Sequence, residues 1–534
     1  MRKWLPLVAV CLGTFMLLVD VTIVTVALPD MARSLKTTFA DLQWVMDVYA
    51  LVLAALLLAA GSLGDRAGHR RLYVAGLVVF AGASLACGLA TDPGVLIAFR
   101  AVQGVGGAAM LATTVALISH LYSGRDLGTA FGVWGAVSGA AAAAGPIMGG
   151  LLTQHLDWRW IFFVNLPISV AAVAMTLRYV GESRSERRPG RDLAGLVTFT
   201  AAAGLATYAL IKGNDYGWGS AKTVGVFAGA AAALAAFVVA ELRGRTPMLD
   251  LGLFRRGTFT GVMIGALLLS GAAFSYFAYE SLWLQSARGM GPVTAGLCFV
   301  PMSGAAFVTA GLGGRLLEGR VSPRVMIGVG LLLIAAGSGL QMLIGAGSSW
   351  TVLVPGLAVS GVGVGLATPT LVSTAVAAVG YQRAGMASGA VNTARQLGNA
   401  LGIAVLGVVF HAGLTSSVRS AGVPRPDAVA DALAAGQTQR VLAAGAPAQR
   451  PVLEHMVHAA FASGLRSAFL AAAVMGAVGG LAVLALVRQP GGGHAGTPNG
   501  GQAEWSGAGS AGAENLGAEN LGAGNTGAAV SAEA

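Results

Sequence analysis

The chain has 534 residues, of which 55% are apolar and only 10% are charged, and its mean hydropathy is +0.72. Soluble domains carry about 25% charged residues, so this composition excludes an ordinary soluble enzyme and a disordered scaffold. The net charge of +10 is compatible with nucleic-acid binding. On so apolar a chain we instead expect arginine-rich loops at a membrane surface and no nucleic-acid partner.

Apolar runs long enough to cross a bilayer recur along the chain. A spanning helix needs about 20 mostly apolar residues, and within lipid its backbone polar groups must bond to one another, so an all-α polytopic membrane protein is predicted. The first run resembles a secretory signal but is longer, and we interpret it as an uncleaved helix. Fourteen spans are predicted, at about 5–28, 43–63, 72–90, 95–118, 127–152, 161–180, 193–211, 222–241, 258–284, 292–313, 325–346, 351–378, 385–411 and 464–487.

The lysines and arginines indicate how these spans cross the membrane. With the N-terminus in the cytoplasm, the inner segments contain 20 of the 33 basic residues and the short outer loops contain six. Membrane insertion favours this asymmetry, and an even number of spans places both termini in the cytoplasm. Arginine outnumbers lysine 29 to 4, which together with the many alanines and glycines suggests a GC-rich bacterial genome.

The loops divide the chain into four predicted parts. These are an N-terminal six-helix bundle, a linker with two inserted spans, a C-terminal six-helix bundle and a disordered cytoplasmic tail. Their residues are 1–180, 181–257, 258–488 and 489–534. An alanine-rich outer loop, 412–463, has the composition of short amphipathic helices. The glycine pattern of residues 103–107 is weakly repeated in residues 361–365, as expected if the two bundles are related halves.

Five ionisable residues fall inside predicted spans, where each costs roughly 2.5–3.5 kcal/mol at a helix centre. Asp20 is either a structural hydrogen-bonding carboxylate or a protonatable group in a central cavity, and it is one possible partner for Arg100. Asp47 and Glu280 lie near the outer ends of their spans. They either reach the membrane interface or act inside, Glu280 by taking up a proton from outside. Arg395 is equally compatible with a structural and a functional role.

The loop between the second and third spans reads GSLGDRAGHRRL. Its glycines permit a tight turn and close helix approach, and its aspartate can pair with an arginine or with a helix N-terminus. We expect a structured cytoplasmic latch here, against the alternative of positive-inside charge alone. The residues assigned to the latch are Gly61, Asp65, Arg66, Gly68, Arg70 and Arg71.

The fifth span contains the sequence GAAAAAGPIMGG. Its proline lacks a backbone donor and favours a kink, and its glycines give a smooth packing surface. The segment is either a generic packing kink or a flexing or sealing element between the two bundles. The residues assigned to it are Gly145, Pro146, Gly149 and Gly150.

No catalytic or metal-binding pattern competes with these features. Cys11, Cys87 and Cys298 lie in apolar runs without CxxC spacing, and we expect them to be buried and free. His455 and His458 have helical spacing but no accompanying cysteine or paired carboxylate, so no metal site is expected. The sequence has no GxxxxGK[ST] pattern and encodes no nucleotide-driven pump.

Taken together, the motifs resemble the major facilitator superfamily, specifically its fourteen-helix drug:proton antiporter branch. GSLGDRAGHRR resembles the superfamily's loop signature after helix 2, FRAVQGVGGA its fourth-helix signature, and GPIMGG the fifth-helix signature of antiporters. VDVTIVTVALP and WRWIFFVNLP resemble signatures of the fourteen-helix branch. The resemblance covers residues 1–488 and departs from the pattern at Thr25, at Ala136 and in the degenerate second-half loop 313–324.

This resemblance implies a proton-coupled exporter of small lipophilic drugs, antibiotics or metabolites in the plasma membrane, working by alternating access. It implies roles in coupling for Asp20 and Arg100, stabilisation of one conformation by Asp65 and Arg66, and an antiporter-type closure shaped by residues 145–146. The proton gradient is the expected energy source, with no cofactor, no enzymatic activity and a monomer as the working unit. The alternatives are an uptake permease for a nutrient, which GPIMGG disfavours, and a membrane enzyme acting on lipid-linked substrates.

Overall fold

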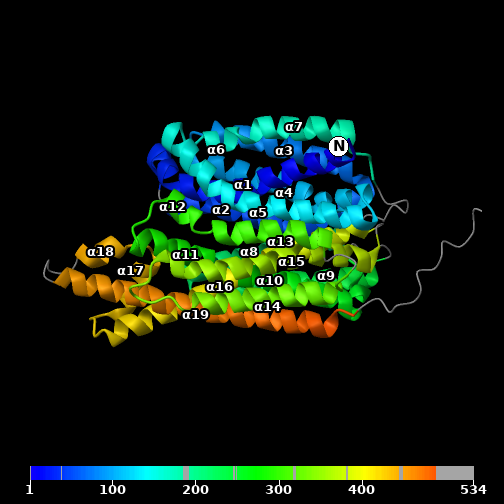
Figure 1. Ribbon diagram of the computed structural model, residues 1–534. Helices are drawn as coiled ribbons and strands as arrows, with labels where there is room; N and C mark the ends of the chain where they lie inside the picture. The colour runs from blue at the N-terminus through cyan, green and yellow to red at the C-terminus, as the bar shows by residue number, and fades with distance from the viewer. Residues whose placement is uncertain are drawn as a thin grey trace, which may run out of the picture. The chain divides into compact units, whose positions relative to one another are not determined.

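The computed structural model describes residues 2–37, 39–183, 192–244, 247, 249–316, 320–380, 383–443 and 449–488. Most of the basic linker and the predicted disordered tail therefore lie outside the described residues. The described part of the chain is built from helices and contains no strand (Figure 1). Thirteen of its helical segments are long and apolar enough to cross a membrane, and α5 (Gly124–His155) covers the remaining predicted span. The predicted all-α polytopic architecture is confirmed.

The first part of the chain contains six long helical segments, as predicted. Besides α5 they comprise η1 (Arg2–Trp4), α1 (Leu5–Leu35), α2 (Phe39–Ala67), α3 (His69–Gly88), α4 (Pro93–Leu121), α6 (Trp160–Phe163) and α7 (Asn165–Tyr179). The start of α4 shows how the sequence sets these bounds. Pro93 takes the first helical position, and the Asp92 carboxylate accepts hydrogen bonds from two backbone N–H groups, at 2.8 and 3.2 Å. α2 and α3 pack against α4, whereas α1 packs against α5 and α7.

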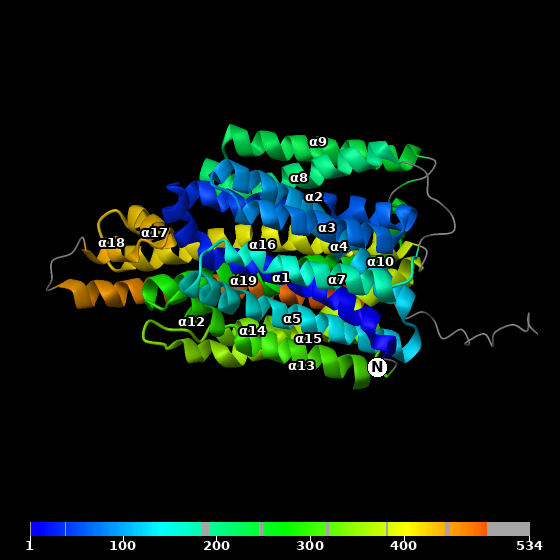
Figure 2. The ribbon, with the colours of Figure 1, turned by 90° about the horizontal axis from the view of Figure 1, so that it is seen from above.

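Helices α8 (Leu193–Tyr216) and α9 (Ala221–Arg243) are the two inserted spans. They pack against each other, and α8 also packs against α2 and against α16 (Ala384–Ser420), so the pair lies beside one helix from each half (Figure 2). Lys212 of α8 is buried, and its Nζ lies 4.8 Å from the ring centre of Trp44 on α2. This cation–π contact attaches the insertion to the N-terminal half.

The C-terminal helices differ from the prediction at two breaks. The span predicted at 258–284 is divided into α10 (Gly257–Ala273), a turn, α11 (Phe277–Leu282) and a π-helical segment, η3 (Trp283–Ala287). The span predicted at 292–313 is divided into α12 (Pro292–Leu297) and α13 (Val300–Leu316). The apolar runs continue through both breaks, so hydropathy could not reveal them. The other elements are η2 (Leu251–Arg255), α14 (Pro323–Gln341), η4 (Trp350–Leu353) and α15 (Val354–Val379).

The predicted outer loop 412–463 is mostly helical. α16 continues to Ser420 instead of ending near residue 411, and α19 (Arg450–Leu486) begins well before residue 464. The short helices α17 (Pro426–Ala434) and α18 (Thr438–Ala443) lie between them. At 37 residues each, α16 and α19 are about 55 Å long, which exceeds the roughly 30 Å hydrocarbon core. The hydropathy pattern therefore placed the end of α16 too early in the chain and the start of α19 too late.

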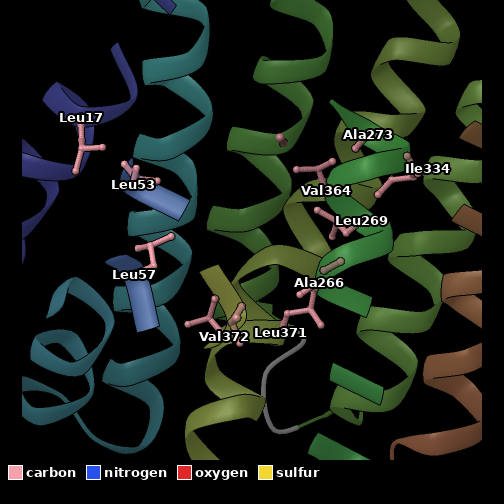
Figure 3. Close-up of a cluster of buried hydrophobic side chains, with 14 of the residues drawn as sticks. Leu17, Leu53, Leu57, Ala266, Leu269, Ala273, Ile334, Val364, Leu371 and Val372 are labelled. Atoms are coloured by element: carbon pink, nitrogen blue, oxygen red, sulfur yellow. The ribbon is translucent and has the colours of Figure 1, made fainter. Parts of the chain in front are cut away.

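The N- and C-terminal halves meet mainly along two helix pairs, α2 with α16 and α5 with α13, and α4 also packs against α16. In the first pair the backbones touch, because a Cβ atom at Gly61 would lie only 2.9 Å from the carbonyl carbon of Gly385. Close approach through glycine is the usual way in which membrane helices pack. Buried apolar side chains of both halves belong to one cluster, in which Leu57 of α2 lies at the left and Ile334 of α14 at the right of Figure 3.

The glycine pattern that is repeated in the two halves corresponds to a repeated packing arrangement. A Cβ atom at Gly106 of α4 would lie 2.8 Å from the carbonyl oxygen of Gly76 on α3. In the C-terminal half, one at Gly363 of α15 would lie 2.3 Å from the carbonyl oxygen of Gly330 on α14. Both helix pairs therefore depend on the absence of a side chain at equivalent points.

Candidate functional site

Asp20, the carboxylate predicted inside the first span, lies near the middle of α1 and is completely buried. Arg100 Nη1 of α4 donates a hydrogen bond to Asp20 Oδ2 at 2.5 Å, and Arg100 Nε donates to the carbonyl of Val45 on α2 at 2.9 Å. The guanidinium also lies 4.3 Å from the ring centre of Tyr49. The structure thus pairs the two residues whose partnership the sequence left open.

Three further side chains, none of them assigned to a site by the sequence analysis, complete this buried network. Gln103 Nε2 donates to Asp20 Oδ1 at 2.9 Å and to Ser84 Oγ at 2.8 Å. Asn165 Nδ2 donates to the same two oxygens at 3.1 and 3.3 Å. Gln103 and Asn165 belong to the motifs FRAVQGVGGA and WRWIFFVNLP, whereas Ser84 lies in no motif, although a polar residue in an apolar span could have signalled it.

The charge state of Asp20 controls how well this network is satisfied. In the ionised form, Asp20 accepts hydrogen bonds from one guanidinium and two amides, which joins α1, α4 and α7. A proton on Asp20 would leave the Arg100 charge unbalanced in a buried position. Breaking a buried ion pair costs about 3–5 kcal/mol, so loss of the Asp20 charge would weaken the packing of these helices.

The remaining ionisable candidates lie apart from this network or at its edge. Asp47 is half-buried on α2, two residues after Val45, whose carbonyl binds Arg100. Glu280 on α11 is completely buried, which excludes the interfacial position considered for it, and neither carboxylate oxygen has a hydrogen-bond partner among the described residues. Arg395 on α16 has a buried Nε that likewise lacks a partner in the described part of the chain.

Asp65, at the end of α2, binds the start of α16 in the other half. The backbone N–H of Gly385 donates to Asp65 Oδ1 and that of Met386 donates to Asp65 Oδ2, both at 2.9 Å. Of the two partners predicted for Asp65, the structure therefore shows the helix N-terminus and not an arginine. The positive end of the helix dipole and two charged hydrogen bonds stabilise this contact, hereafter the latch contact.

His69 supports the latch contact from α3, and the prediction did not assign it there. Its Nε2 lies 3.1 Å from Asp65 Oδ1, and its Nδ1 lies 3.0 Å from the carbonyl oxygen of Ser183 at the start of the linker. The two ring nitrogens therefore contact Asp65 on one side and the linker on the other. The linker thereby joins the same cluster as the two halves.

The other residues assigned to the latch make no contact with the C-terminal half in the described structure, except Gly61, which touches Gly385. Arg70 Nη2 donates to a backbone carbonyl of α7 at 2.9 Å, and Arg71 Nε lies 3.5 Å from Glu182 Oε2. Arg66 has neither a hydrogen bond nor an ion pair with another described residue. Gly68 has a φ of +105°, which favours glycine, and a side chain there would meet the Glu182 carboxylate.

The fifth-helix element packs α5 closely against α1. α5 is one continuous helix across Pro146, and Gly145, Gly149 and Gly150 are buried. A Cβ atom at Gly145 would lie 2.8 Å from Thr22 Cβ and overlap its hydroxyl. The glycine at this position is therefore required by the closeness of the two helices.

We expect Gly145→Ala to destabilise the protein by about 1–3 kcal/mol, because overpacking must push α1 and α5 apart. The measurement is the unfolding temperature of the detergent-solubilised protein. Gly139→Ala on the same helix is the matched control, since a Cβ atom there would have its nearest neighbour at 3.4 Å. Equal unfolding temperatures for the two variants would contradict the close-packing explanation.

An apolar cavity of about 630 Å³ lies between α1 and α5. Pockets of this size accommodate small organic molecules, and an apolar lining suits lipophilic ones. The lining residues include Trp4, Leu7, Cys11, Phe15, Val133 and Val137.

Comparison with known proteins places this architecture in a family. Residues 10–403 match the sequence pattern of the Major Facilitator Superfamily. The multidrug resistance protein Stp of Mycobacterium tuberculosis is 37% identical over 415 residues, covering 78% of this chain and 77% of the relative. The tetracenomycin C resistance and export protein of Streptomyces glaucescens is 36% identical over 495 residues, covering 89% and 90%.

A solved structure shares the fold at much lower sequence identity. The human organic anion transporter MFSD10 superposes with a TM-score of 0.60 at 14% identity, covering 90% of this chain and 99% of that one. Identity this low supports the fold alone, whereas the match over residues 10–403 and the bacterial relatives support the family. The chain therefore belongs to the Major Facilitator Superfamily.

Proposed function

We propose that this protein is a proton-coupled exporter of small lipophilic drugs, antibiotics or metabolites in the bacterial plasma membrane. Its relatives are named for multidrug resistance and for resistance to and export of an antibiotic, which favours export over nutrient uptake. Membership of a transporter superfamily sets aside the alternative of a membrane enzyme. The observation that carries the proposal is the completely buried ion pair of Asp20 and Arg100.

Protonation of Asp20 is the proposed coupling step. While Asp20 is ionised, Arg100, Gln103 and Asn165 hold α1, α4 and α7 in the observed arrangement. A proton entering from outside would weaken these bonds and favour a second arrangement, and release of the proton inside would restore the first. A ligand shifts such an equilibrium only by its different affinity for the two states, and here the proton is that ligand.

The latch contact is the proposed closure of the cytoplasmic side. By the predicted orientation, Asp65 and the N-terminus of α16 lie at the cytoplasmic face, where they join the two halves. Opening the transporter inward then requires loss of these bonds. Glu280, buried and unpartnered in the described structure, is proposed as a second proton acceptor in the C-terminal half.

The proposed cycle takes its energy from the proton gradient and needs no cofactor. A single chain contains both halves and is proposed as the working unit. The bacterial relatives and the arginine-rich composition support a GC-rich bacterium as the source.

We expect bacteria expressing the protein to accumulate less of at least one dye than cells with empty vector. The dyes are ethidium, Nile red and fluorescein, which are cationic, neutral and anionic respectively. A proton uncoupler should abolish the difference, because export against a concentration gradient requires the proton gradient. Higher accumulation in expressing cells would instead favour an uptake permease.

A further inference from the structure

The middle of α16 carries a polar face inside a membrane-spanning helix. Asn392, Arg395, Gln396 and Asn399 follow the spacing i, i+3, i+4 and i+7, which places them on one side of an α-helix. Polar side chains at this depth are costly in lipid and face protein or a water-filled cavity. The polar face therefore points into the protein.

The glycines of α16 indicate which part of the protein the polar face meets. On one side, a Cβ atom at Gly398 would lie 2.7 Å from the carbonyl carbon of Leu267, so this side packs against α10. On the other side, Gly389 packs in the same way against Leu57 and Leu58 of α2. At 100° per residue, Arg395 lies between these two sides. It therefore lies on the part of the helix surface between the side that contacts α10 of one half and the side that contacts α2 of the other.

Arg395 differs from Arg100 in having no counter-ion among the described residues. Arg100 is bonded to a carboxylate, an amide oxygen and a backbone carbonyl. Arg395 makes no hydrogen bond or ion pair with any described residue, and its Nε is buried. The residue as a whole is of intermediate exposure, so part of its side chain remains accessible.

The buried acidic residues of the spans do not neutralise this charge. Both carboxylate oxygens of Glu280 lack a partner among the described residues, so Glu280 does not pair with Arg395. Asp20 is engaged by Arg100, Gln103 and Asn165. The described interior of the transporter thus contains one accessible cation whose charge nothing in the described chain balances.

From these contacts we infer that Arg395 binds an acidic group of the transported compound, such as a carboxylate or an ionised phenol or enol. A guanidinium presents two parallel N–H donors to a carboxylate and keeps its charge at all physiological pH values. Gln396 supplies a further amide on the same face for a neighbouring hydroxyl or carbonyl oxygen. The amide of Asn392 instead donates to Ser388 at 3.0 Å, and the Oδ1 of Asn399 accepts from Ser275 at 3.4 Å. This inference rests on the proposed export function and adds the chemical class of the substrate.

Equilibrium binding of two dyes to the purified full-length protein tests this assignment. Fluorescein is a dianion at pH 7.5 and rhodamine 6G is a cation on a similar xanthene skeleton, so the pair separates charge from shape. We expect Arg395→Gln to weaken fluorescein binding, followed by fluorescence anisotropy, about tenfold or more, the effect of losing one charged hydrogen-bonded contact. Rhodamine 6G binding should be unchanged or stronger.

Two further variants make the result specific. Arg395→Lys keeps the charge without the planar fork and should retain part of the fluorescein affinity. Arg419→Gln removes an arginine from the exposed end of the same helix and should bind both dyes as wild type does. Equal loss of both dyes in Arg395→Gln, or no loss of fluorescein, would overturn the inference. Absence of saturable fluorescein binding to the wild type would overturn it as well.

The binding assay needs no membrane and no proton gradient, so its outcome is separate from that of the export assay. Arg395-dependent fluorescein binding without export would leave the anion site standing and contradict the exporter. If instead a dye is exported in an uncoupler-sensitive way and fluorescein binding does not depend on Arg395, the export function is supported and the anion site is contradicted.

Discussion

Replacing Asp20 with asparagine is expected to abolish uncoupler-sensitive export and to destabilise the protein. Asparagine still accepts a hydrogen bond but carries no charge and no transferable proton. Arg100, which is 1% exposed, would then be a buried cation without its counter-ion. Removing one member of a buried pair costs about 3–5 kcal/mol, so the unfolding temperature should fall together with export.

A double variant separates the loss of coupling from the loss of stability. In Asp20→Asn with Arg100→Gln, no unpaired charge remains, and most of the lost stability should return because both partners are neutral. Export should stay absent, since the protonatable group is missing. The measurements are the unfolding temperature of the purified protein and dye efflux from energised cells. Wild-type export by the double variant would show that Asp20 is not the coupling residue.

Replacing Asp65 with asparagine is expected to open the cytoplasmic side more often. In the wild-type protein, the backbone N–H groups of Gly385 and Met386 each donate a hydrogen bond to one oxygen of the Asp65 carboxylate at 2.9 Å. An asparagine amide offers one oxygen, and its NH₂ group would face the other donor. Loss of one charged hydrogen bond costs about 1.5–3 kcal/mol, which shifts the balance between closed and open conformations roughly tenfold to a hundredfold.

Labelling of a buried position reports this opening. Leu57 is completely buried where α2 meets α16, so a cysteine at residue 57 should react with a membrane-impermeant maleimide only when the halves separate. The natural Cys11, Cys87 and Cys298 are free and must first be replaced. We expect faster labelling from the cytoplasmic side in the Asp65→Asn background.

The controls for this experiment are one acidic and one basic residue of the same face. Asp126 pairs with Lys3 at 3.0 Å, but both side chains are about half exposed, and such pairs contribute little. Asp126→Asn should therefore label like the parent protein. Arg66→Gln should also have little effect, because Arg66 has no partner among the described residues. Equal labelling rates for Asp65→Asn and Asp126→Asn would contradict the role of the latch contact.

The helices, their approximate order in the membrane and the residues worth testing all follow from the amino-acid sequence. These inferences depend on local physics: a lipid environment forces helices, and every charge placed in a span carries a cost that demands a reason. Asp20, Arg100 and Asp65 could be chosen on this basis, and the loop and helix motifs around them identified the family before any contact was known.

Which partner each of these residues has depends on the tertiary structure. The pairing of Asp20 with Arg100, the capping of α16 by Asp65 and the lack of a partner for Arg395 among the described residues depend on how each helix is rotated and on which helices are neighbours. Hydropathy records how apolar a segment is but not which way its side chains point. For the same reason it could not show the breaks in the span around Glu280 or the continuation of α16 and α19 beyond the bilayer.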